Sequence, residues 1–531
     1  MENKTKKSSR AVSLILNKKL SFMKKLSVVL LAVLVSMATM AAPVDAQRAR
    51  QVALTAAKLY SWELSQQNKA RMNPNAECLL KDVTAEVGIS HIYVFNYAIA
   101  DGNREGFVVV SGDDAAAPVL AFSDEGALEM NPAVRFHLEQ YSHQIASAQE
   151  AGTCASKVLQ HKWEQLASGK AINEAVQRFE AKGDLYNDNI NRLLGGMVWG
   201  QSNPYNRRCP GGSVTGCVAT AFGMIMNYWD YPVHGFGQHS YNGADNPAAY
   251  GNWQWGEQSA DFEHTYYDWK HMDNYAVINS PDSVVNAIST LLYHLGVSLD
   301  MNYGLDGSGC WSLPEYATYD TSLHLSATVG ADTRIPRHFG YKFSYAGMRD
   351  SVHSDSLWLQ MLYNSLADSM PIYYAGWAKD DSDDGHSGTS GHGYILDGYF
   401  SDAIDSNLFH INWGWNGSAD GFFKLDAMRP NNSDFTQWHG AIIGLEPDTS
   451  YHGYDPSGIR TLESATAIVY SEAGRIVVKG CENSVVAIYD LMGRIVAHRD
   501  SRQGAEWSTA VNRGIYVVRV GNQMGQKVVV M

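Results

Sequence analysis

The sequence is poor in cysteine, in charge and in long apolar runs. Its 531 residues include only 6 cysteines, and the 41 Lys and Arg are outnumbered by 55 Asp and Glu. The scattered cysteines exclude a disulfide-dense fold, although one or two bridges, for example between Cys209 and Cys310, stay open. The net charge of −14, with no basic stripe beyond the first 25 residues, excludes nucleic acid as a partner, because phosphate binding requires clustered Lys and Arg.

Metal ligation also lacks support in the sequence. No cysteine and histidine spacing is typical of a metal site, so neither a metal nor a cofactor is expected. The acidic loop 380–385 has no Glu at the twelfth position of a calcium-binding loop, which is Gly391. We therefore interpret this loop as a flexible active-site loop.

What the chain does contain is typical of a large globular protein. Hydrophobic residues make up 45% of the chain, which also has 47 glycines and 14 tryptophans. Such a composition indicates a folded, loop-rich and aromatic-rich chain and excludes general disorder. Its length predicts about two to four domains.

The basic and apolar start of the chain is typical of a secretory signal peptide. Lys24 and Lys25 precede the apolar run 26–35, and alanines follow at positions 38, 41, 42 and 46. The apolar run is too short to span a membrane. We therefore expect residues 1–46 to be a signal peptide whose true start is Met23, and the mature protein to be secreted or held at the cell surface.

Patterning divides the remaining chain into three parts. Residues 47–190 contain strand-like runs, "HIYVFNYA" and "GFVVVSGDD", and helix-like stretches at 133–149 and 162–179, which predict an α+β domain. Residues 191–447 hold most of the Trp, Tyr and Gly and are expected to form the main domain. Residues 448–531 comprise a linker and short β-branched runs separated by turns, which predict a small all-β sandwich.

Cys217 lies in a sequence context that favours a reactive thiolate. In "GGSVTGCVATAFGMIMNYWDYP", residues 211–232, Cys217 follows a glycine-rich turn and precedes an apolar run with helical spacing that Pro232 ends. The apolar stripe comprises Val218, Ala221, Phe222, Ile225 and Trp229. At the start of a helix, free N–H groups and the helix dipole favour a thiolate over a thiol. The alternative is an ordinary buried core cysteine.

A thiolate nucleophile requires a base, and His392 is the best placed of the 18 histidines. It stands between two glycines in "SGTSGHGYILDGYF", residues 387–400, at the head of an apolar strand, where small neighbours leave the imidazole accessible. His386 lies in an acidic loop and is interpreted as part of a solvated turn, and His410 lies within a strand and is interpreted as packed. For His392 itself, the alternative is a strand-end histidine without a chemical role.

The next strand supplies candidates to orient the base. An antiparallel hairpin that includes "LFHINWGWNGSADGFFKL", residues 408–425, brings residue 392 opposite a residue between 412 and 416. Asn412, Trp413 and Trp415 fall in or beside that window and offer an amide or an indole to hold and shield the imidazole. The alternative is a Trp-rich hairpin packed for stability.

An oxyanion donor is available upstream. Gln201 lies in the turn-rich segment "MVWGQSNPYN", and its side-chain NH2 together with the Cys217 backbone N–H can form an oxyanion hole. A loop glutamine alone indicates little. The order of Gln, Cys, His, and Asn or Trp indicates acyl transfer.

Four blocks carry a family resemblance: "WGQSNPYN", "GCVATAFGMIMNYWDYP", "GHGYILDGY" and "HINWGWNGSADGFF". In this order they resemble the streptopain family of secreted bacterial cysteine peptidases, which includes interpain. The resemblance covers about residues 196–447 and implies a papain-like fold of two subdomains. It implies Cys217 as nucleophile, His392 as base and Gln201 as oxyanion donor. The orienting and shielding group is implied to be Asn412 with Trp413 and Trp415.

The flanking regions have resemblances of their own. Residues 47–190 resemble the inhibitory propeptide of the same family, which implies an intramolecular inhibitor that occupies or distorts the site until it is cut near 185–196. The end of the chain resembles the C-terminal sorting domain of the type IX secretion system, with "YDLMGRIV" and "GIYVVRV" carrying the likeness. Contact with that secretion machinery is therefore implied.

Together these features predict an α+β, papain-like cysteine endopeptidase made as a zymogen. The resemblance implies protein or peptide substrates and broad specificity, with an apolar preference two residues before the scissile bond. Two alternatives stay open. One is a secreted binding or adhesion protein with a catalytically silent fold, and the other is an acyltransferase or amidase that uses the same Cys and His pair.

Overall fold

A computed structural model describes the chain from residue 43 to 451, except for 68–71, 102–103, 183–188, 243–254, 311, 314–329, 353, 379–390, 402–406 and 428–436. Beyond 451 it describes 468–472, 474–479, 485–490, 495–499, 506–520 and 526–530. The expected signal peptide up to residue 42, the acidic loop 380–385 and His386 lie outside the described residues. The chain forms two compact units. The first comprises residues up to 187 with 401–408 and 423–435, and the second comprises 188–400, 409–422 and 436–531.

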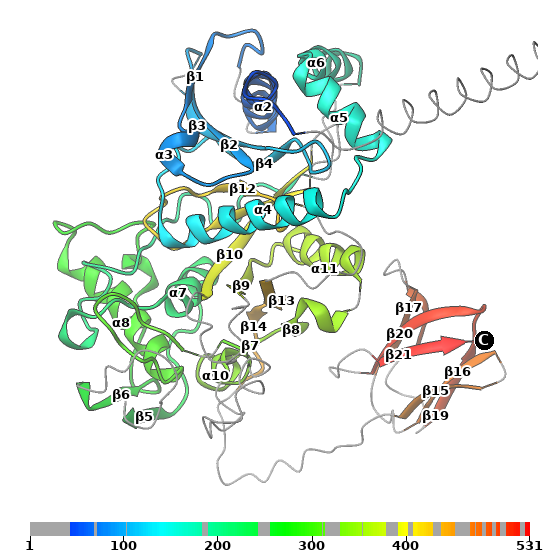
Figure 1. The fold of residues 1–531 in the computed structure, drawn as a ribbon. Coiled ribbons are helices and arrows are strands. Elements are labelled where there is room, and N and C mark those ends of the chain that lie inside the picture. The colour runs from blue at the N-terminus through cyan, green and yellow to red at the C-terminus, as the bar shows by residue number, and fades with distance from the viewer. Residues whose placement is uncertain are drawn as a thin grey trace, which may run out of the picture. The chain divides into compact units, whose positions relative to one another are not determined.

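The first unit combines an antiparallel sheet with helices (Figure 1). Its strands pair in the order β1 (Cys78–Asp82), β2 (Ile92–Ile99), β3 (Arg104–Ser111) and β4 (Val119–Ser123). Its helices are α2 (Ala46–Gln67), α3 (Thr84–Val87), α4 (Pro132–Glu150), α5 (Lys157–Ala167) and α6 (Lys170–Lys182). The expected α+β pattern is confirmed, and α2 is a helix that the sequence patterns did not indicate. Gly169, with φ 72°, divides the second helical stretch into α5 and α6.

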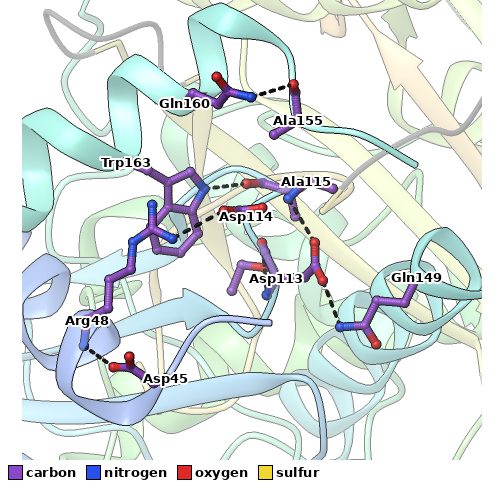
Figure 2. A network of polar contacts seen from close by, with 11 residues as sticks. Asp45, Arg48, Asp113, Asp114, Ala115, Gln149, Ala155, Gln160 and Trp163 are labelled. Carbon is purple, nitrogen blue, oxygen red and sulfur yellow. Dashed lines mark hydrogen bonds and ion pairs between the residues drawn. The ribbon is translucent and has the colours of Figure 1, made fainter. Parts of the chain in front are cut away.

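A network around Trp163 anchors helix α5 to the first unit (Figure 2). The fully buried indole donates from Nε1 to a carbonyl in the turn after β3 at 3.0 Å, and the Arg48 guanidinium lies 4.9 Å from the ring centroid. Arg48 also forms an ion pair with Asp114 at 3.2 Å. Beside this pair, Asp113 accepts a hydrogen bond from the Gln149 side chain at 2.9 Å. Helices α2, α4 and α5 are therefore joined at one turn by a cation–π contact and charge-assisted hydrogen bonds.

Helix α4 holds a segment that comes much later in the chain. The Tyr141 hydroxyl and the His137 Nε2–H both donate to the Lys424 carbonyl, the latter at 2.9 Å. The Gln144 side-chain oxygen accepts from the Ala427 N–H at 2.8 Å. Burial lowers the pKa of His137 to about 4, so the imidazole is neutral in the folded unit at neutral pH.

We expect this histidine to make the first unit sensitive to acid. In the unfolded chain the His137 imidazole takes up a proton near pH 6.5, whereas the folded unit resists protonation down to about pH 4. The unfolded state therefore binds more protons in this window, and the free energy of unfolding falls by about 3 kcal/mol as the pH drops through it. Thermal unfolding of the full chain between pH 7 and pH 4 measures the effect. His137→Gln, which keeps an N–H donor, should flatten this dependence, and an unchanged slope contradicts the assignment.

The second unit contains a sheet in the order β12 (Gly421–Phe423), β11 (Leu408–Asn412), β10 (Gly391–Phe400), β9 (Ile372–Ala378), β13 (Gln437–Ile443) and β8 (Tyr345–Met348). Two small pairs accompany it, β5 (Gln238–Asn242) with β6 (Glu257–Asp261) and β7 (Tyr341–Lys342) with β14 (Glu446–Pro447). The helices are α7 (Cys217–Trp229), α8 (Asp282–Ser298), α10 (Ala331–Phe339) and α11 (Asp355–Ala367), with 3-10 turns η1 (Pro210–Gly212), η4 (Trp269–His271) and η5 (Arg349–Val352). Helices α7 and α8 lie side by side and share one hydrophobic core (Figure 1).

Helix α7 confirms the helix expected after the glycine-rich turn. Its end differs from the expectation, because Asp230 already takes the left-handed conformation, with φ 49°, before Pro232 is reached. Its packing differs as well. Every residue from Val218 to Asn227 is buried, so α7 is enclosed on all sides and not along one stripe. Gly223 permits this closeness, since a Cβ there would lie 2.5 Å from the Leu292 side chain of α8.

The described strands near the C-terminus form two sheets. One comprises β15 (Ile468–Glu472), β16 (Arg475–Lys479) and β19 (Glu506–Ala510), and the other comprises β18 (Ile495–Arg499), β17 (Val486–Asp490), β20 (Gly514–Val520) and β21 (Gln526–Val530). Side chains of both sheets share one core, which includes Ile476, Ile488 and Val518. This arrangement is the small all-β sandwich that the sequence predicts.

Two further features of the described residues concern the thiols and the membrane. Cys78, Cys154, Cys209, Cys217 and Cys310 are all free, so the bridge between Cys209 and Cys310 is not formed. Among the described helices, none has the length and apolar character needed to cross a bilayer.

Candidate active site

Cys217 is the first residue of α7. Gly216 is the N-cap, with φ 87° and ψ 142°, a conformation that glycine adopts without strain. A Cβ at position 216 would also come within 2.8 Å of the Met301 side chain. Glycine at this position therefore allows the helix to begin directly at the thiol, as the sequence predicts.

The Cys217 sulfur lies among hydrogen-bond donors. The Gly393 backbone N–H donates to Sγ at 3.3 Å, and the Val218 backbone N–H and the His392 side chain also form hydrogen bonds with it. Burial raises the pKa of the thiol, but the His392 charge and these hydrogen bonds outweigh it, and the pKa of Cys217 is lowered from its ordinary value. The arrangement favours a thiolate paired with an imidazolium.

His392 lies near the start of β10, where it pairs with Gly376 of β9. Its Nε2 atom lies 2.8 Å from the Trp413 carbonyl oxygen and 3.3 Å from the Trp415 indole Nε1. A carbonyl can only accept and an indole N–H can only donate. Nε2 therefore has a partner whether it carries a proton or not, and Nδ1 is left as the nitrogen for the Cys217 sulfur.

Asn412 takes part in the site differently from the two tryptophans. Its side-chain NH2 donates to the Met197 carbonyl at 2.7 Å, and its side-chain oxygen accepts from the Gly414 N–H at 3.0 Å. Both bonds hold the chain where β11 ends. Of the three candidates to orient the base, the structure thus brings the Trp413 carbonyl and the Trp415 indole to His392, and it directs the Asn412 amide elsewhere.

Gln201 is tied to the turn that precedes α7. Its backbone carbonyl accepts from the Thr215 N–H at 3.0 Å. Its side-chain nitrogen is buried and has no hydrogen-bond partner within the described part of the chain. A buried donor without a partner is unusual, because a lost hydrogen bond is costly in the interior. The Gln201 amide is therefore available to a ligand.

A buried acidic residue behind the site was missed by the sequence reasoning. Asp420 is 2% exposed, and its Oδ1 accepts from the Trp413 backbone N–H at 3.0 Å. Burial raises the pKa of this carboxyl to about 7, against the lowering effects of the Trp413 N–H and of His410. The one available signal was an isolated acid between small residues in "GSADGFF", just before an apolar strand.

A second buried carboxylate lies in the same region. Asp397 pairs with His410 Nδ1 at 2.5 Å and accepts from the Leu194 N–H at 3.2 Å. His410 is buried, which confirms its interpretation as a packed histidine. Within the described residues, no group of three or more His, Cys, Asp or Glu side chains is arranged to hold a metal ion.

Comparison with known families agrees with this geometry. Residues 199–423 match the Peptidase C10 family, and residues 41–145 match the Spi protease inhibitor family. This part of the chain is therefore similar to cysteine peptidases of the C10 family. The expected resemblance to the streptopain and interpain group is thereby supported, and the adhesion and acyltransferase alternatives are not favoured.

Two relatives and one solved structure each match about two thirds of the chain. The chain is 27% identical to streptopain of Streptococcus pyogenes over 389 residues, which cover 68% of this chain and 82% of the relative. It is 26% identical over 371 residues to the thiol protease/hemagglutinin PrtT of Porphyromonas gingivalis, covering 67% of this chain and 37% of that protein. Among solved structures, a Prevotella intermedia prointerpain A fragment aligns with 25% identity and a TM-score of 0.43, covering 69% of this chain and 98% of the fragment.

Proposed function

We propose that Cys217 and His392 are the catalytic pair of a secreted cysteine endopeptidase made as a zymogen. The observation that carries this proposal is the hydrogen bond between the two side chains, together with the lowered pKa of the thiol. The two residues lie far apart in the chain, and a structural cysteine has no need of an imidazole partner. A lowered pKa favours the thiolate, which is the nucleophile that peptide hydrolysis by a cysteine requires.

The mechanism follows from the donors and acceptors around the sulfur. The Cys217 thiolate attacks the substrate carbonyl carbon, and the carbonyl oxygen becomes an oxyanion. The His392 imidazolium then gives its Nδ1 proton to the amine as the C–N bond breaks, which leaves an acyl-enzyme and a neutral imidazole. The imidazole next takes a proton from water, the resulting hydroxide attacks the thioester, and the carboxylic product leaves the thiolate behind.

Gln201 is proposed to hold the oxyanion together with the Cys217 backbone N–H. Its buried, unpartnered amide nitrogen supports this role, because a donor that binds only the oxyanion has no hydrogen-bond partner before substrate reacts. The bond between the Gln201 carbonyl and Thr215 connects the glutamine to the turn that leads into Cys217.

The remaining candidates are proposed to act on His392. The Trp413 carbonyl accepts from the Nε2–H of the imidazolium and orients it, and the Trp415 indole, whose Nε1 lies 3.3 Å from Nε2, shields the ring. Asn412 is proposed to stabilise the turn after β11, which holds Trp413 and Trp415 next to His392. Its amide makes the turn-forming bonds described above, and this assigns it a supporting role.

The flanking regions are proposed to control where and when the peptidase acts. Residues 47–190 form the inhibitory propeptide, which is cut near 185–196, and residues 191–447 form the enzyme. The match of residues 41–145 to a protease inhibitor family supports the first assignment. Residues 448–531 are proposed as the linker and sorting domain for type IX secretion, which follows export by the signal peptide 1–46. Protein substrates with an apolar side chain two residues before the cut are proposed.

Covalent labelling tests the catalytic pair. A peptidyl fluoromethyl ketone with an apolar residue in the matching position should label Cys217 in the reduced protein after maturation, as read by peptide mapping of the whole mixture, which includes the released propeptide. Cys154, an exposed free thiol, is the internal control and should stay unlabelled, because its Sγ faces the Gly152 carbonyl and not an imidazole. Equal labelling of both thiols, or of neither, contradicts the proposal.

A further inference from the structure

We propose that Asp420 is the positioning residue of the catalytic base and acts on His392 through the main chain of Trp413. The inference rests on the proposed function, because it takes His392 to be the base. It gives a role to a residue to which neither the sequence analysis nor the family comparison assigns one.

The contacts form a continuous path. His392 Nε2 lies 2.8 Å from the Trp413 carbonyl oxygen, and the Trp413 backbone N–H donates to Asp420 Oδ1 at 3.0 Å. The Trp413 indole also donates to the Ala419 carbonyl at 3.0 Å. Trp413 is thus held at its backbone and at its ring by two consecutive residues, and its carbonyl is presented to the imidazole.

The site needs such a restraint because a main-chain carbonyl orients the base. Trp413 follows the last residue of β11 and precedes Gly414, which has φ 70°. Four residues of this loop, Gly414, Asn416, Gly417 and Ala419, have positive φ. Carbonyls in an irregular turn of this kind are not fixed by a sheet ladder. The Asp420 carboxylate supplies the fixed acceptor at the far end of the turn.

The surroundings make this acceptor respond to pH. Asp420 and Trp413 are both almost fully buried, at 2% and 1% exposure. The charged groups that face Asp420 are His410 and Arg192, which favour its ionised form, and Asp397, which opposes it. Burial is the largest influence and raises the pKa of Asp420 to about 7. The carboxyl therefore titrates near neutral pH, and its bond to Trp413 is strongest when it is ionised.

Asp397 provides a matched control in the same neighbourhood. It is a buried carboxylate too, but its bonds go to His410 and to the Leu194 N–H. Its replacement disturbs the packing behind the site without removing the acceptor of the Trp413 N–H.

The test compares Asp420→Asn, Asp420→Ala and Asp397→Asn, each prepared as the full chain and matured by a trace of wild-type enzyme. The measurements are kcat, KM and the rate of Cys217 alkylation by iodoacetamide against pH. The alkaline limb of the alkylation profile reports deprotonation of the imidazolium that pairs with the thiolate.

The Asp420→Asn variant keeps an acceptor oxygen without the charge, so it should lower kcat about tenfold with KM nearly unchanged, and Asp420→Ala should lower kcat further. In both Asp420 variants the imidazolium of His392 should lose its proton more easily, so the alkaline limb of the Cys217 alkylation profile should move to lower pH by about one unit.

The outcomes separate a positioning role from a structural one. Asp397→Asn should lower the Tm and leave the alkaline limb in place. If both Asp420 variants lose thermal stability but keep the wild-type alkaline limb and kcat, Asp420 is only structural and the inference is overturned. Should Asp420→Ala fail to fold, Asp420→Asn decides the question alone. A wild-type enzyme that shows no enhanced alkylation at low pH refutes the proposed catalytic pair itself, which is a different result.

Discussion

Replacement of Cys217 by Ala abolishes peptide hydrolysis and self-maturation. The variant lacks the sulfur that is proposed to attack the carbonyl, so we expect kcat to fall by about five to six orders of magnitude, as when the nucleophile of a hydrolase is removed. Incubation of the purified full chain with a thiol reductant, followed by mass spectrometry, reports both the cuts and their rate. The intact chain of the variant should persist, whereas the wild type should be cut near 185–196.

A control variant keeps this result specific. Cys154→Ala removes an exposed free thiol and should mature at the wild-type rate. If the Cys217→Ala zymogen still matures by itself, without a trace of active enzyme, Cys217 is not the nucleophile.

Replacement of His392 by Ala removes both the proposed base and the charge that lowers the pKa of Cys217. In the native site burial raises the pKa of Cys217 and His392 lowers it. Without the imidazole the effect of burial prevails, so the thiol should stay protonated at pH 6 and alkylate slowly. We expect kcat/KM to fall by at least about 10⁴, and the alkylation rate at pH 6 to fall by about tenfold or more.

Gln201→Ala distinguishes loss of the thiolate from loss of catalysis in general. The glutamine is proposed to act on the oxyanion and not on the sulfur. Its removal should therefore lower kcat by about 10² to 10³ while alkylation of Cys217 keeps the wild-type rate.

For the His392→Ala variant, alkylation at pH 6 as fast as in the wild type would contradict the pairing of the His392 and Cys217 side chains.

The local elements were predictable because their signals are local. The glycine-rich turn and apolar spacing around Cys217 predicted α7 and its start, and alternation of short β-branched runs predicted the C-terminal sandwich. The full burial of α7 was not predictable, since it depends on the partners that cover its other faces. Likewise, the segment Lys424–Ala427 belongs by contact to the first unit, through bonds to α4 that connect residues nearly 300 positions apart.

Within the site, side-chain chemistry was predictable and main-chain chemistry was not. Cys217 and His392 could be chosen as candidates from their residue type and their glycine neighbours, and Gln201 from its place in the order of the motifs. The acceptor that faces His392 Nε2 is the backbone carbonyl of Trp413, and any residue at that position has such a carbonyl. Asp420 was missed for the same reason, because its partner is a backbone N–H.

By itself the sequence determined which reactive groups the protein carries, in what order, and on which kinds of local element. These properties depend on residue type and short-range spacing, which the chain contains explicitly. The tertiary structure alone decided which donor approaches which acceptor, and how far each group is removed from water. Hydrogen bonds and burial are set by contacts between distant segments, so the depressed pKa of Cys217 and the raised pKa of Asp420 exist only in the folded unit.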